Sequence, residues 1–432
     1  MKTIGVCGPV NLKLLNWDMK NEDLPCTNAF PLVSHYVNGL VKRGFKVIVY
    51  TNSHTIKEPQ VLESNNITVC IGRQKPSPGR RFFNFEINEL HSLIQAYPSD
   101  IISAFWSYEF ALAALKSGIT TVVNIHDVAF QVLLKQPDVF RFVRWLMNIR
   151  VINKAKHLVA NSSYTYNQLD PDARSKTTVI NNFYTCELEA ACVSCAEKQN
   201  YIASVSQGFI KRKNIHGALK AFSILKKSFP DLAYHLIGVG MEENGPAHRY
   251  AKSLKLDVGV KFIGCLPFDE VLKQIAYAKV LLHPSKEESF GMAVLEAMVV
   301  GTPVVGGSNS GFVPQLLNNG RAGILCDVTS PECLASSTTS LLTDTLLNYN
   351  IIQEARMFAR NNFSEDVIMD KHLAYINQIL GLPNSIKITH DKQQSQVQEY
   401  PETTPHFVNE DDSYYLYPTS LKNPLNATPH KQ

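Results

Sequence analysis

A buried strand, a loop, a short helix and a second buried strand follow one another in the second half of this chain. The apolar run from Lys279 to His283 predicts the first strand, and Pro284 to Phe290 predicts the loop. Gly291 to Val300 predicts a short helix, and Pro303 to Gly306 begins the next strand after a glycine stop. Buried strands joined through a helix are typical of a βαβ unit, so this segment predicts a parallel sheet.

The same alternation of short apolar runs and amphipathic stretches recurs along most of the chain, which predicts an α/β fold with doubly wound parallel sheets. In the first half we expect strands at residues Thr3 to Cys7, Lys46 to Tyr50, Ile67 to Ile71, Asp100 to Phe105, Thr120 to Ile125, His157 to Ala160 and Thr177 to Ile180. In the second half we also expect strands at Tyr201 to Ser206, Leu232 to Gly238, Val260 to Gly264 and Gly323 to Cys326.

This pattern divides the chain into five parts. Residues 1–183 and 201–349 are predicted to form two Rossmann-like domains, joined by a polar linker at 184–200. Residues 350–382 are helical in period, and residues 383–432 are rich in Gln, Ser, Thr, Asn and Pro. Such a composition cannot bury enough apolar surface to offset the ordering entropy, so we expect a disordered tail. Facing doubly wound domains place ligands at the carboxyl ends of their strands, in the cleft between them.

Two glutamates stand on either side of the turn from strand to helix. Glu288 lies in the loop, and Glu296 lies about one turn inside the helix, so both can face the point where the helix begins. The free backbone amides and the positive dipole end at that point suit a phosphate group. Amides flanked by carboxylates that accept hydroxyl protons predict a site for a nucleotide joined to a sugar. The alternative is an ordinary Rossmann-type turn carrying two surface glutamates.

The glutamates and the residues around them resemble the signature of the retaining glycosyltransferases that have the GT-B fold of two facing Rossmann-like domains. The resemblance implies that Glu288 holds hydroxyls of the donor sugar and that Glu296 holds the ribose hydroxyls of the nucleotide. It also implies that the backbone of Phe290, Gly291, Met292 and Ala293 meets the diphosphate. Residues 1–183 would be the acceptor side, residues 201–349 would bind the nucleotide sugar, and the helices of 350–382 would cross back to the first domain.

A basic loop after the strand Tyr201 to Ser206 supports this interpretation. Gly208 lets the backbone turn, and Arg212 and Lys213 precede a helix predicted for Ile215 to Phe229. Lys213 resembles the lysine of the family's phosphate clamp, and Arg212 is the candidate for its arginine. Gly238 and Gly264 end the next two strands, where the family's glycine turns border the nucleotide base. A solvated basic start of a helix is the alternative for the basic loop.

In the first half, His126 follows the strand Thr120 to Ile125 and resembles the histidine that touches the donor sugar in the family. Trp106 and Tyr108 follow another strand and could line the acceptor pocket, although packing in the core explains them equally well. Gly8 follows the first strand, but the family's usual pair of glycines before the first long helix is missing. The identity of the acceptor therefore cannot be transferred.

Composition and motifs narrow the partners. A hydrophobic fraction of 45% is enough for two cores, and a net charge of +4 is too small to indicate nucleic acid. No Asp-x-Asp pair occurs in the donor half, so we expect no metal and no cofactor. Scattered cysteines and a first strand that starts at once favour a cytoplasmic protein. Arg141, Arg144, Arg150, Lys154 and Lys156 accompany aromatic residues on one predicted helix, and such a face can also lie peripherally on the inner membrane surface.

The sequence therefore predicts a retaining, metal-independent glycosyltransferase that moves a sugar from a nucleotide-diphosphate sugar to a hydroxyl of a glycan or a lipid-linked acceptor. Glu288, His126 and Lys213 are its candidate catalytic residues. A catalytically silent nucleotide-sugar-binding protein is one alternative, and an epimerase or phosphorylase of the same fold is another.

Overall fold

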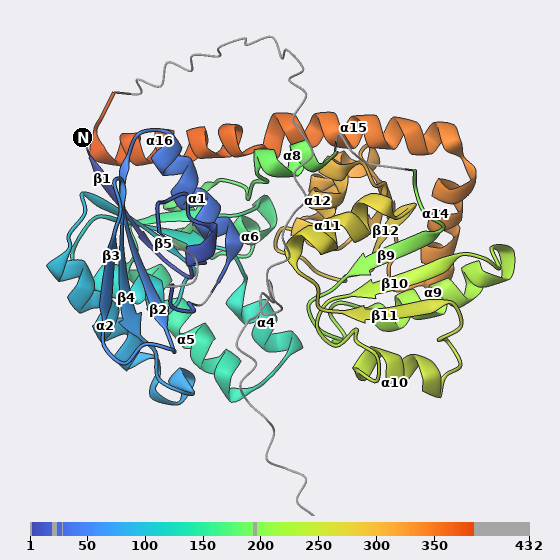
Figure 1. The fold of residues 1–432 in the computed structure, drawn as a ribbon, viewed down its shortest axis with the longest axis horizontal. Helices are drawn as coiled ribbons and strands as arrows, with labels where there is room; N and C mark the ends of the chain where they lie inside the picture. The colour runs from blue at the N-terminus through green and yellow to red at the C-terminus, as the bar shows by residue number, and fades with distance from the viewer. Residues whose placement is uncertain (1, 20–23, 28, 193–196, 384–432) are drawn as a thin grey trace, which may run out of the picture.

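The computed structural model describes residues 2–19, 24–27, 29–192 and 197–383. Two sheets, one from each half of the chain, stand side by side (Figure 1). The predicted disordered tail from residue 384 onward lies outside the described residues.

The first sheet has the strand order β3-β4-β2-β1-β5-β6-β7-β8 and is parallel except at its β3 edge. Its strands are β1 (Thr3–Cys7), β2 (Lys46–Ser53), β3 (Gln60–Glu63), β4 (Ile67–Arg73), β5 (Ile101–Phe105), β6 (Thr121–Ile125), β7 (His157–Ala160) and β8 (Thr177–Val179). The sequence analysis missed β3, which is short, lies at the edge and pairs antiparallel with β4. All the other strands were predicted to within about three residues.

The second sheet has the order β11-β10-β9-β12-β13-β14, and all its pairs are parallel. Its strands are β9 (Tyr201–Val205), β10 (Ala233–Ile237), β11 (Val260–Gly264), β12 (Val280–His283), β13 (Val304–Gly307) and β14 (Ile324–Cys326). β9 and β12 are neighbours although five helices and strands separate them along the chain. The loops that follow these two strands therefore meet at the point where the strand order reverses, which is where ligands bind in such sheets.

Helices cover both faces of each sheet, as the doubly wound class requires. On the first sheet, the helices are α1 (Pro31–Lys42), α2 (Asn84–Ala96), α3 (Glu109–Lys116), α4 (Ala129–Lys135), α5 (Val139–Lys154), α6 (Ser163–Asn167) and α7 (Pro171–Ser175). On the second, they are α9 (Ile215–Ser228), α10 (Pro246–Ser253), α11 (Phe268–Tyr277), α12 (Met292–Val300), α13 (Val313–Leu316) and α14 (Pro331–Thr343). Each face has its own cluster of buried apolar side chains.

The helical segment after residue 344 consists of two helices. α15 (Thr345–Phe363) packs on α12, and α16 (Glu365–Leu380) packs on α1 of the first half, so the pair spans both halves along one side (Figure 1). The helices break at Ser364, which forms a β-bridge with Tyr184. Inside residues 184–200, which were predicted as a linker, lies another short helix, α8 (Cys186–Cys192), which packs on α12.

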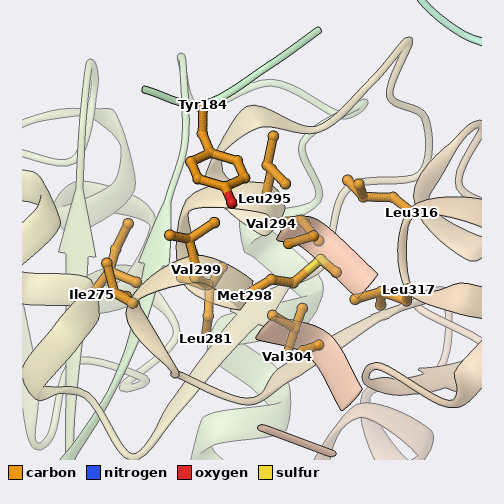
Figure 2. Close-up of a cluster of buried hydrophobic side chains, with 14 of the residues drawn as sticks. Tyr184, Ile275, Leu281, Val294, Leu295, Met298, Val299, Val304, Leu316 and Leu317 are labelled. Atoms are coloured by element: carbon orange, nitrogen blue, oxygen red, sulfur yellow. The ribbon is translucent and has the colours of Figure 1, made fainter. Parts of the chain in front are cut away.

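The core around α12 positions the candidate site. Val294 and Leu295 of α12 pack against apolar side chains of β12, β13, α11 and α13, among them Leu281, Val304 and Leu316 (Figure 2). Every residue from 294 to 300 is buried, and Glu296 is the one charged residue among them. Burying a carboxylate in an apolar helix costs several kcal/mol unless hydrogen bonds or countercharges compensate for the lost water.

Candidate functional site

Glu288 and Lys213 meet at the reversal point of the second sheet. The Lys213 Nζ atom lies 2.6 Å from Glu288 Oε1, and both side chains are largely buried. His283, the last residue of β12, places its Nε2 atom 3.3 Å from the same carboxylate oxygen. The structure thus brings together two predicted residues that are far apart in sequence, and it adds His283, which the sequence analysis counted only as part of a strand.

Electrostatics keep the Glu288 carboxylate charged. Burial alone raises the pKa of Glu288, but Lys213, His283 and Arg212 together lower this pKa well below its usual value. The Arg212 Nη1 atom is 3.9 Å from Glu288 Oε2 and donates a hydrogen bond of 3.1 Å to the Glu287 carbonyl. Cationic groups therefore surround a fixed negative charge, which is an arrangement that can hold both an anionic group and a sugar hydroxyl.

The basic loop is anchored to the Glu288 loop by Asn214. This residue has a left-handed backbone (φ 54°) at the start of α9, and its Nδ2 atom donates to the Pro284 and Val328 carbonyls at 3.2 and 2.7 Å. The Lys286 amide also donates to the Arg212 carbonyl at 2.9 Å. No role was predicted for Asn214; its side chain does not cap α9, and its partners at Pro284 and Val328 are too far along the chain to leave a local signal.

The start of α12 lies directly after the Glu288 loop. Gly291 has a φ of 103°, which a residue with a side chain rarely adopts, and it turns the chain into the helix that begins at Met292 and continues through Ala293. The first amides of a helix have no intrahelical acceptor and point outward from its end. Phe290 is 2% exposed and stacks on Phe312 at 5.3 Å, so only its backbone is available for the predicted phosphate contact.

The predicted glycine turns also gather at this edge of the sheet. Gly208 donates its amide to the Val239 carbonyl at 3.1 Å, and Gly238 donates to the Gly264 carbonyl at 2.7 Å. A Cβ atom on Gly238 would stand 2.1 Å from the Ser206 carbonyl oxygen. The turns after β9, β10 and β11 therefore pack backbone against backbone, and this arrangement tolerates no side chain at Gly238.

His126 faces this edge from the first half. It follows β6, stacks on Phe105 at 5.5 Å and contacts Phe30 edge-on at 5.6 Å. Burial lowers the pKa of His126 to about 4, against a smaller opposing effect of Asn182, so its imidazole is neutral near pH 7. A cavity of about 10 Å³, roughly the space of one water molecule, lies between His126 and His372 of α16.

The three predicted acceptor-side residues take structural positions. Gly8 follows β1, and a Cβ atom there would stand 3.0 Å from the Phe105 side chain. Trp106 follows β5 with a left-handed backbone (φ 66°) and stacks on Phe30 at 5.8 Å. The Tyr108 hydroxyl donates to Asp127 Oδ2 at 2.7 Å, which orients a carboxylate directly after His126.

Part of the basic helix face predicted for α5 is not on the surface. The Arg144 guanidinium forms an ion pair with the buried Glu109 and lies 4.4 Å from the centre of the Tyr108 ring. Arg141 pairs with Asp138 at the start of the helix. Phe130 and Phe142, in contrast, are each 46% exposed and contact Trp145. Within the part of the chain that the structure describes, no helix is long and apolar enough to cross a membrane.

The loop around Glu288 also joins the two halves, which the sequence analysis did not foresee. Glu287 is 7% exposed and pairs with Lys135 of α4, and it accepts a 2.7 Å hydrogen bond from the hydroxyl of Tyr164 in α6. The Ser289 hydroxyl donates to the His126 carbonyl at 2.8 Å. Partners this far away in the chain leave no local sequence signal.

Comparison with known proteins gives matches in both halves. The family model of Glycosyl transferases group 1 matches residues 193–358, and the model of Glycosyltransferase Family 4 matches residues 32–188. N-acetyl-alpha-D-glucosaminyl L-malate synthase of Bacillus anthracis is 23% identical over 288 residues, which are 63% of this chain and 73% of that protein.

Solved structures share the fold. A sucrose-phosphate synthase from Thermosynechococcus elongatus superposes with a TM-score of 0.70 at 16% identity, covering 88% of this chain and 100% of that one. HepE from Anabaena, solved in complex with UDP and glucose, gives a TM-score of 0.63 at 18% identity, covering 87% of this chain and 99% of that one. The fold and both family models confirm the predicted resemblance, and the chain belongs to the GT-B glycosyltransferases.

Proposed function

We propose that this glycosyltransferase is retaining and metal-independent and that it uses a nucleotide-diphosphate sugar as donor. The buried pair of Glu288 and Lys213, at the reversal point of the second sheet and beside the start of α12, is the observation that carries the proposal. HepE, which has the same fold, was solved with UDP and glucose, and this supports a nucleotide-sugar donor for the present chain.

In this proposal the diphosphate lies between the basic loop and the amides of residues 290–293. The Lys213 ammonium has three N–H donors, so it can keep its bond to Glu288 and still donate to a phosphate oxygen. Arg212 adds a second positive charge to the same side. Fixed cations and amides aimed at the leaving group stabilise charge that develops only as the sugar–phosphate bond breaks. This arrangement replaces the metal ion that other glycosyltransferases use.

Glu288 accepts hydrogen bonds from hydroxyls of the donor sugar, and Glu296 accepts them from the ribose. The bond from the anomeric carbon to the phosphate oxygen breaks, and its electron pair stays on the diphosphate. The acceptor hydroxyl bonds to the anomeric carbon from the same face, and its proton passes to the departing phosphate oxygen. His126, being neutral, stabilises the oxocarbenium-like sugar by a hydrogen bond or dipole and not as the base.

The acceptor is proposed to be a glycan or a lipid-linked sugar, because apolar side chains are exposed at the ends of α4 and α5. Within the described residues these are Phe130, Leu134, Val139, Phe140 and Phe142, and Phe82, just before α2, is exposed as well. With exposed Arg80 and Arg81 in the short turn Pro78–Arg81 that packs on α5, this face has the composition of a surface that rests on anionic lipid. Replacing Phe130 and Phe142 by Ser should reduce sedimentation with vesicles of anionic phospholipid; equal sedimentation of variant and wild type would remove the membrane from the proposal.

A donor screen tests the central proposal. Release of nucleoside diphosphate is measured with a panel of nucleotide sugars and crude acceptors, with and without EDTA, and the product anomer is determined by NMR. The proposal expects release that EDTA does not change and an anomeric configuration equal to that of the donor. An inverted product refutes retention, and donor binding without any release favours the silent binding protein. Phosphate-dependent cleavage or an isomerised nucleotide sugar would identify a phosphorylase or an epimerase.

A further inference from the structure

Glu287, directly before the proposed donor-binding glutamate, has its carboxylate partners in the other half of the molecule. It belongs to the loop after β12, yet Oε1 accepts from the Tyr164 hydroxyl at 2.7 Å and Oε2 pairs with the Lys135 ammonium. α4, which carries Lys135, lies toward the second half in Figure 1. Glu287 is 7% exposed and the Lys135 side chain 37%, so the carboxylate is largely withdrawn from water while the ammonium keeps access to it.

Ser289, on the other side of Glu288, is held by the first half as well. Its hydroxyl donates to the His126 carbonyl at 2.8 Å, and its own carbonyl accepts from the Ser162 hydroxyl at 2.5 Å. Glu288 itself pairs within its own half, with Lys213. The three consecutive residues thus alternate: the outer two bind the first half, and the middle one faces the proposed donor site.

We propose that Glu287 is a positioning residue that couples closure of the two halves to the placement of Glu288. The inference rests on the role proposed above for Glu288. When the halves separate, the Glu287 carboxylate exchanges Tyr164 and Lys135 for water, and the loop loses its attachment beside Glu288. When they close, the bonds to Glu287 and Ser289 fix the loop on both sides of Glu288, so the backbone that carries Glu288 is held from both halves only in the closed molecule. Closing a site in this way also excludes water from the reaction.

The backbone of Glu287 extends the coupling to the phosphate side. Its carbonyl accepts the 3.1 Å hydrogen bond from Arg212, whose neighbour Lys213 contacts Glu288. A shift of Glu287 would therefore displace the carbonyl that Arg212 contacts and, through the chain, the Glu288 carboxylate that Lys213 contacts. A carboxylate suits this position because it is stable in water when the halves are apart and between Tyr164 and Lys135 when they are closed. An apolar side chain would be buried on closure, and exposing it to water again would make opening unfavourable.

The experiment compares Tyr164→Phe, Glu287→Gln and the double variant in the full chain. Two fluorophores, on unnatural amino acids at the exposed positions Glu58 and Lys252, report the separation of the halves without any activity assay. Glu270→Gln, which removes an exposed ion pair inside α11, is the matched control. We expect about a tenfold smaller ratio of closed to open molecules in Glu287→Gln and about a threefold smaller ratio in Tyr164→Phe, from loss of hydrogen bonds to a buried charge.

Turnover should fall by the same factors, while affinity for the nucleoside diphosphate alone should change less than about twofold, because its proposed contacts all come from the second half. The loss in the double variant should be smaller than the product of the two single losses, since both changes act on the contact between Tyr164 and position 287. Unchanged fluorescence transfer in both single variants overturns the proposal, as does an equal loss of nucleotide affinity and turnover. Tyr164→Phe retains its buried ring and serves if Glu287→Gln fails to fold. If the wild-type chain transfers no sugar but the variants still open, the proposed function fails while the closure contact stands.

Discussion

Changing Glu288 and Lys213 one at a time and together should separate what this ion pair does for stability from what it does for the reaction. Glu288→Gln leaves the Lys213 ammonium buried beside Arg212, with no countercharge from position 288. Removing one partner of a buried pair typically costs about 3–5 kcal/mol, and because each side chain is still slightly exposed we expect the lower end, about 3 kcal/mol. Lys213→Met should cost less, about 2 kcal/mol, since Arg212 and His283 still face the carboxylate.

The double variant Glu288→Leu with Lys213→Met should recover most of that stability. Replacing both partners of a buried ion pair by apolar side chains is often neutral or stabilising. Its activity, however, should not recover. If Glu288 accepts hydrogen bonds from two sugar hydroxyls in the transition state, each worth about 1.5–3 kcal/mol, its loss lowers kcat/KM by about two to four orders of magnitude.

The assay pairs urea unfolding at pH 7 with release of nucleoside diphosphate, and Glu270→Gln, which alters only an exposed pair, is the control. We expect the double variant to be folded, to be as stable as the wild type to within about 1 kcal/mol, and to be inactive. Glu288→Gln with turnover within about threefold of wild type, or a double variant that is active, would refute the assignment of Glu288 to the donor sugar.

Three further predictions concern neighbouring groups. Gly311→Ala should lower the free energy of unfolding by about 1–3 kcal/mol and also reduce turnover. Gly311 has a φ of 65°, and an added Cβ would stand 2.1 Å from the Glu288 carbonyl oxygen. Urea unfolding and a turnover assay with the donor check this prediction. Glu296→Gln should weaken binding of the nucleoside diphosphate about tenfold in calorimetry, through weaker bonds to ribose, and unchanged affinity would contradict that role. Acidification from pH 6.5 to 5 should lower the free energy of unfolding by about 1.6 kcal/mol for each of His126 and His372, whose folded pKa values are about 4 and 3. Both side chains stay neutral in the folded state and gain a proton in the unfolded state. His372→Phe should therefore make the loss on acidification smaller in urea unfolding.

The parts of the fold that the sequence predicts are those with strong local signals. The segment from β12 to β13 alternates a buried strand, a glycine-bounded helix and a second buried strand, and its bounds were predicted to within one residue. β3 was missed because four half-exposed residues at an edge have little apolar periodicity. Residues 350–382 were predicted to form helices, but the position of the break at Ser364 was not predicted because the apolar period continues through it; the β-bridge to Tyr184 that accompanies the break is a tertiary contact.

In the site, residue type, spacing and the family resemblance together pointed to Glu288 and Lys213, and both follow strands whose carboxyl ends share one edge of the sheet. The same reasoning misplaced Arg144 on an exposed basic face, because a cation on an amphipathic helix usually lies in water. Here the guanidinium is surrounded by Phe83, Tyr108 and Phe140 and paired with Glu109, an acid that is buried in α3. The sequence of one helix shows which of its residues are charged. It does not show that a neighbouring helix, here α3, supplies an ion-pair partner for one of these residues.

The adjacent residues Glu287 and Glu288 show most clearly what the local sequence cannot predict, namely the direction in which each side chain turns. They have the same chemistry, and nothing within the loop says which one turns toward Lys213 and which toward Lys135. That choice depends on how the two halves meet, since the Glu287 partners lie 123 and 152 residues earlier in the chain. A carboxylate bound across the cleft must break its bonds each time the halves separate, whereas one bound inside its own half need not. The two glutamates are therefore subject to different physical demands, one to the energy of closure and the other to the charge of the donor site.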